Sequence, residues 1–106
     1  MSHEKQIERI AQMEQRLDAS EEVLRKLTDA LDAYEQNQKE LKKLMDYYGS
    51  SRWMKDFQDD EAGKLPKDLK RGVLSEDELY DLIFDHRDAV LTMSRLVADA
   101  IAGRML

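Results

Sequence analysis

One uninterrupted stretch constrains this fold most: from residue 4 to residue 48 the sequence contains neither glycine nor proline. Its apolar residues recur at alternating steps of three and four, which is the spacing of a coiled-coil seam. The seam positions are Ile10, Met13, Leu17, Ser20, Leu24, Leu27, Leu31, Tyr34, Gln38, Leu41, Met45 and Tyr48. The pattern predicts one long helix over residues 4–48. The alternative is a bend near Ser20, where Asp18 or Ser20 would cap a new helix.

Residues 50–74 are predicted to form a short helix followed by an ordered loop. Gly49 is expected to end the long helix in the left-handed conformation, and a serine directly after it can cap the next helix. Trp53 and Phe57 are four residues apart and therefore share a helix face. We expect both rings to pack near Tyr48 and Leu79. Proline at position 66 disfavours helix at the residue before it, so a loop should begin there.

The last helix, over about residues 75–102, has the clearest start in the chain. Ser75 and Glu78 have the spacing of a capping box, in which each side chain accepts a hydrogen bond from the other residue's backbone N–H. Leu74 and Leu79 flank the cap as a hydrophobic staple. The apolar face of this helix is broader than a two-stranded seam, so we expect it to face more than one neighbour.

These elements predict an all-α protein with one domain over residues 1–106. The proposed architecture is a long antiparallel, coiled-coil-like helical hairpin, in which the short helix and the ordered loop cap the closed end. A length of 106 residues suits a single domain. Strand signals are missing, because β-branched residues are few and no segment alternates polar and apolar residues.

The loop carries the most specific motif. Tyr47-Tyr48-Gly49-Ser50, Trp53 and the continuous stretch from Asp60 to Asp77, which includes Gly63-Lys64-Leu65-Pro66, resemble a family catalogued as domain of unknown function 4298. The resemblance covers about residues 7–100. It implies a small, helical, bacterial protein, and it brings no activity, ligand or catalytic residue.

Composition excludes several classes of function. The net charge of −6 disfavours nucleic acid and anionic membrane surfaces as partners, because both require clustered basic residues. The absence of cysteine excludes disulfides and thiolate chemistry. No apolar run approaches the ~20 residues of a membrane span, so we expect a cytoplasmic protein. No general base accompanies a nucleophile, so we predict no catalytic, cofactor-binding or metal-binding residues and no enzyme activity.

The loop remains the candidate interaction site. Acidic side chains precede a group of closely spaced basic ones, beside two aromatic residues. The candidate residues are Trp53, Phe57, Asp60, Lys64, Lys67, Asp68, Lys70 and Arg71. The basic side chains could bind an anion or an acidic partner, or they could pair with nearby carboxylates. The sequence leaves both interpretations open.

The first helix is longer than the last, so its N-terminal part should extend beyond the hairpin. This overhang carries Ile7, Ile10, Met13 and Leu17, the candidate self-association seam. A two-fold homodimer would bury these side chains. We therefore predict a non-catalytic interaction or scaffold protein. The alternatives are a regulatory domain that responds to an anion or small ligand through residues 56–72 and, third, an enzyme.

Overall fold

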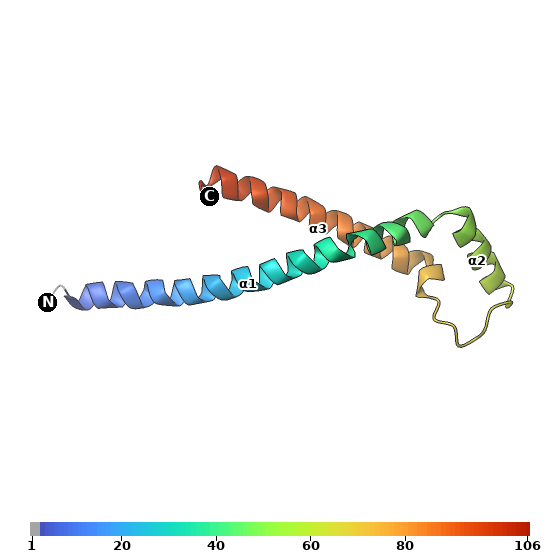
Figure 1. Cartoon of the computed structure of the whole chain (residues 1–106), viewed down its shortest axis with the longest axis horizontal. Coiled ribbons are helices and arrows are strands. Elements are labelled where there is room, and N and C mark those ends of the chain that lie inside the picture. Colours follow the sequence, from blue (N-terminus) through green and yellow to red (C-terminus); the bar gives the residue numbers. More distant parts are fainter. Residues whose placement is uncertain (1–2) are drawn as a thin grey trace. The chain divides into compact units, whose positions relative to one another are not determined.

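The computed structural model of the chain describes residues 3–106 and is all-α, as the sequence predicts (Figure 1). The elements in order are α1 (His3–Tyr47), α2 (Ser51–Glu61), the short 3-10 helix η1 (Gly72–Leu74) and α3 (Glu76–Ala102). The described residues contain no strand. The predicted helix boundaries agree with the observed ones to within one or two residues.

Helix α1 is continuous through residues 18–20, so the predicted continuous helix is confirmed and no new helix begins at Asp18 or Ser20. Its 45 residues correspond to a length of roughly 67 Å at the rise of an ideal α-helix. The chain divides within α1 into two compact units, of which the first ends at Glu40 and the second is Leu41–Leu106. The antiparallel pairing of α1 with α3 stays a prediction.

Glycines in the left-handed conformation end the first two helices. Gly49 has φ +78° and Gly63 has φ +74°. After α2, the Gly63 N–H donates to the Asp60 carbonyl and the Lys64 N–H to the Asp59 carbonyl, both at 3.0 Å. This pair of bonds is a Schellman motif, which satisfies the last carbonyls of a helix. Residues with a Cβ avoid this conformation, so the two glycines set where α1 and α2 stop.

We expect Gly63→Ala to destabilise the unit 41–106 by about 1–2 kcal/mol, because an L-residue is strained at this positive φ. No side chain stands within 4 Å of the added Cβ, so the cost is conformational and not steric. Gly63→Asn should cost less, since asparagine tolerates the left-handed region. Urea denaturation of the three proteins checks this, and equal stability of all three would contradict it.

The start of α3 confirms one half of the predicted capping box and corrects the other. The Ser75 side chain accepts a hydrogen bond from the Glu78 N–H at 3.4 Å. The reciprocal bond does not form, because the Ser75 N–H already donates to the Gly72 carbonyl at 3.0 Å within η1. The preceding 3-10 turn thus occupies the donor that the Glu78 carboxylate would have taken.

Candidate functional site

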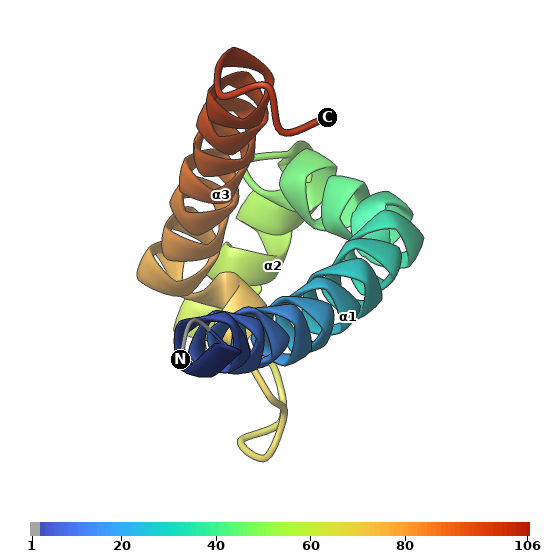
Figure 2. The ribbon, with the colours of Figure 1, turned by 90° about the vertical axis from the view of Figure 1, so that its left-hand side faces the viewer.

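A small aromatic cluster forms the core of the second unit. Trp53, Leu74 and Leu79 are buried, with 5%, 7% and 4% of their surfaces exposed. Five partly buried residues pack against them, namely Leu44, Tyr47, Tyr48, Phe57 and Leu65. The predicted packing of Trp53 and Phe57 with Tyr48 and Leu79 is therefore confirmed. The cluster unites side chains from the end of α1, helix α2, the loop and the start of α3. Figure 2 shows the ribbon of these segments.

Trp53 is the centre of this cluster. Its ring lies edge-on to Tyr48, with centroids 5.2 Å apart, and stacks on Phe57 at 5.3 Å. Both are favourable arrangements of aromatic quadrupoles. The indole Nε1–H donates a hydrogen bond of 2.9 Å to the Val73 carbonyl. One side chain of α2 thus anchors the far end of the loop through both apolar and polar contacts.

Hydrogen bonds also join the end of α1 to α2. Ser50 caps α2, since its Oγ accepts a bond from the Trp53 N–H at 3.2 Å, and the same hydroxyl donates to the Tyr47 carbonyl at 2.6 Å. The Tyr47 hydroxyl donates to Asp56 at 2.6 Å. Partial burial, this hydrogen bond and the negative charge of Asp56 raise the pKa of Tyr47 to about 12.

This raised pKa predicts a loss of stability at alkaline pH. The pKa of Tyr47 in the folded protein lies above its ordinary value of 10.0. The contribution of the protonated Tyr47 hydroxyl to the free energy of unfolding is therefore complete below pH about 10, and it is lost as the pH rises to about 12. Tyrosinate absorbance should show a late-titrating group that Tyr47→Phe removes. A titration of the native protein that is complete by pH about 11 would contradict this.

The loop between α2 and η1 is ordered around Arg71. Its guanidinium donates to Asp60 Oδ1 at 2.9 Å and to the backbone carbonyls of Lys67 and Pro66 at 3.1 and 2.8 Å. One charged side chain thus closes the loop onto α2. Lys64 also pairs internally, with its Nζ 3.8 Å from Asp59. Of the two interpretations that the sequence left open, internal pairing describes Arg71 and Lys64.

The structure separates the candidate interaction residues into two groups. Trp53 is buried and Phe57 is half-buried in the cluster, while Asp60 and Arg71 pair with each other. The exposed members are Lys64, Lys67, Asp68 and Lys70. The first group holds the loop in place, and the second group presents the more exposed side chains to a partner.

An open groove of about 440 Å³ lies beside the cluster. Four apolar residues line it, Leu44, Val73, Leu79 and Leu82, together with Lys70, Gly72 and Glu78. No sequence pattern indicates this groove, because its walls come from three separate segments, α1, the loop and α3. The apolar walls and the two charged side chains of this groove suit a ligand or side chain that has both an apolar part and a charged group.

The candidate self-association seam is solvent-exposed. Ile7, Ile10, Met13 and Leu17 have 65%, 53%, 52% and 50% of their surfaces exposed. The later apolar seam residues Leu24, Leu27 and Leu31 are also exposed. Half or more of the surface of each of these four residues therefore contacts water, on one face of a helix.

The described part of the chain contains neither a metal-binding group of side chains nor a membrane-spanning helix. Residues 3–106 contain no group of three or more histidine, aspartate or glutamate side chains arranged to hold a metal ion. Within the same residues, no helix combines the length and the apolar content that crossing a membrane requires.

Comparison with known proteins identifies the family. No curated protein and no solved structure matches the chain. A family model described as a domain of unknown function matches residues 10–96, a range that includes the α1 seam, α2, the loop and most of α3. The match confirms the resemblance inferred from the loop motif. The chain therefore belongs to the family of the domain of unknown function DUF4298.

Proposed function

We propose that this protein is a non-catalytic helical interaction module that self-associates as a homodimer through the seam of α1. The exposure of Ile7, Ile10, Met13 and Leu17 carries the proposal. Burying an apolar side chain of this size releases roughly 1.5–3 kcal/mol. Four such residues on one helical face give a substantial drive toward association.

The polar surface of the same helix supports this proposal. The faces away from the seam carry ion pairs between neighbouring turns, such as Arg25 with Glu22 at 2.6 Å. Such a helix is suited to water on one side and to an apolar partner on the other. A long amphipathic helix of this kind is a common device for joining protein chains.

The arrangement of the loop favours a structural role for it over anion sensing. Arg71 and Lys64, two basic residues of the loop, both pair with carboxylates of α2. An anion would have to displace these contacts. Lys67 and Lys70 remain exposed, and they are the residues through which the loop could contact a protein partner.

Sedimentation velocity of the native protein, from about 1 to about 100 µM, tests the proposal. We expect a reversible monomer–dimer equilibrium, because a micromolar dissociation constant corresponds to about 8 kcal/mol, which a few buried apolar side chains can supply. Arg71→Ala should leave this equilibrium unchanged, since Arg71 lies outside the seam. A single monomeric species over the whole range would refute self-association.

A further inference from the structure

Over the first two heptads of the α1 seam, from Ile10 to Ser20, the flanking residues form a charge pattern. Arg9 and Arg16 directly precede the seam residues Ile10 and Leu17, whereas Glu14 and Glu21 directly follow Met13 and Ser20. We call Arg9, Glu14, Arg16 and Glu21 the flanking charges. One flank of the seam is therefore basic and the other acidic over the same two heptads.

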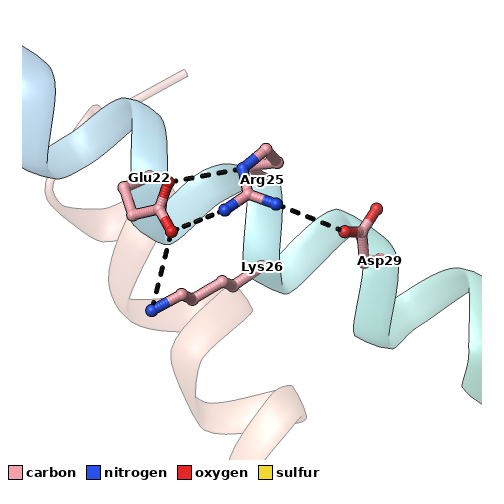
Figure 3. Close-up of polar contacts among 4 residues, drawn as sticks. All are labelled: Glu22, Arg25, Lys26 and Asp29. Carbon is pink, nitrogen blue, oxygen red and sulfur yellow. Dashed lines mark hydrogen bonds and ion pairs between the residues drawn. The ribbon is translucent and has the colours of Figure 1, made fainter.

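The flanking charges differ from the charges on the outer face of α1. There, Glu22 binds Arg25 at 2.6 Å and Lys26 at 3.6 Å, and Arg25 also lies 3.9 Å from Asp29 (Figure 3). In the heptad repeat of α1, these four residues occupy positions that neither belong to the seam nor flank it. They satisfy one another within a single helix.

The flanking charges, by contrast, have no such partners. Among residues 3–106 none of the four takes part in an ion pair. Each arginine is followed by a glutamate five residues later, a spacing that side chains on the same helix do not bridge. Arg16 lies along the seam, with its Nη1 3.7 Å from the Met13 sulfur.

We propose that α1 pairs with α1 of a second copy of this chain as a parallel, in-register, two-stranded coiled coil. This inference rests on the self-association proposed above and adds its geometry. In a parallel coil, the residue before one seam position lies opposite the residue five places later on the other helix. Arg9 therefore meets Glu14 of the second copy, and Arg16 meets Glu21. The two-fold axis doubles each pair.

An antiparallel arrangement is disfavoured by the same charges. In an antiparallel pair, each flank runs beside the equivalent flank of the other helix. Arg9 and Arg16 would then face arginines of the second copy, and Glu14 and Glu21 would face glutamates. Like charges across a pairing interface discriminate against that alignment.

The flanking charges also indicate how many helices the coiled coil contains. In bundles of more than two helices, the positions that flank the seam become increasingly buried. Burying Glu14, Arg16 and Glu21 would carry a large desolvation cost. In a two-stranded coil these side chains stay at the edge of the interface, in contact with water.

Single cysteines test the orientation directly, because the natural chain contains none. Met13→Cys and Ser20→Cys place a thiol in the seam, and Gln15→Cys places one on the outer face as a matched control. Ser20→Cys is nearly isosteric. Oxidation at tens of micromolar should link Met13→Cys and Ser20→Cys into covalent dimers, whereas Gln15→Cys should give little product. Circular dichroism checks that each variant keeps its helix content.

An antiparallel dimer can bring at most one of the two seam positions opposite its own copy. If the native mass is that of a dimer and only one seam variant cross-links, or neither does, the parallel arrangement is wrong and self-association stands. A monomeric mass overturns both proposals. Cross-linking of both seam variants with little product from the outer-face control supports the parallel coil.

Charge reversal provides an independent test. Arg16→Glu should raise the dimer dissociation constant roughly tenfold, since each dimer loses two exposed ion pairs and gains two repulsions. The double variant Arg16→Glu with Glu21→Arg should restore it, because the pairs re-form with opposite polarity. An unchanged dissociation constant for Arg16→Glu, or no recovery in the double variant, overturns the parallel pairing.

Discussion

Trp53→Ala is expected to destabilise residues 41–106 by about 3–5 kcal/mol, the range for truncation of a buried aromatic side chain. Trp53 is one of three buried residues in the cluster and contacts both Tyr48 and Phe57. The substitution also removes the hydrogen bond to the Val73 carbonyl, which holds the end of the loop. Because small domains are stable by only about 5–15 kcal/mol, the loss is a large share of the total.

Urea denaturation followed by circular dichroism measures this effect. Met54→Ala is the matched control, because Met54 is the next residue of α2 and 47% of its surface is exposed. We expect that control to change stability by less than about 1 kcal/mol. An equal loss of unfolding free energy in Trp53→Ala and Met54→Ala would contradict the claim that Trp53 is the centre of the core. Native fluorescence resembling indole in water would also contradict it.

Local signals explain how much of the fold could be predicted. Helix α1 follows from a seam without glycine or proline, and its end follows from Gly49, whose positive φ other residues avoid. Ser50 and Ser75 cap α2 and α3 because their hydroxyls accept bonds from nearby backbone N–H groups. All these effects act within a few residues along the chain, so sequence spacing is sufficient to identify them.

Other features depend on contacts between distant residues and could not be predicted. The partners of Arg71 include two carbonyls of its own loop, and no spacing rule indicates those contacts. The bond from Tyr47 to Asp56 requires the turn between α1 and α2 to have one particular geometry. The groove beside Leu79 likewise forms only when three segments meet.

Much of the apolar surface of the described residues is exposed to solvent. Only three residues among those described are buried apolar residues, whereas long apolar side chains along α1 and α3 are exposed. Examples on α3 are Leu91, Val97 and Ile101. Contiguous exposed apolar surface on a soluble protein commonly marks a place of protein contact. Self-association through α1 would cover the α1 part of this surface.

Ile10→Asp combined with Leu17→Asp is expected to abolish the dimer. Both residues lie in the seam and are about half exposed in the single chain. In a two-fold dimer each chain contributes both substitutions, so one interface contains four substituted residues. At roughly 1.5–3 kcal/mol for each lost apolar burial, the total is about 6–12 kcal/mol. A micromolar dimer is held by only about 8 kcal/mol, so no dimer should survive at that concentration.

The control for this variant changes the outer face of the same helix. Gln15→Asp together with Glu22→Gln alters charge away from the seam and leaves the net charge unchanged. We expect this control to remain a dimer. Helix content should stay similar in all the proteins, because aspartate in the middle of a long helix costs only a fraction of a kcal/mol at each site.

Light scattering at tens of micromolar tests the central claim most directly, because it gives the mass in solution without a label. The account predicts twice the mass of the 12.4 kDa chain for the native protein and for the outer-face control. It predicts the mass of one chain for Ile10→Asp with Leu17→Asp. A native protein with the mass of one chain, or a dimer that the seam substitutions leave intact, would contradict it.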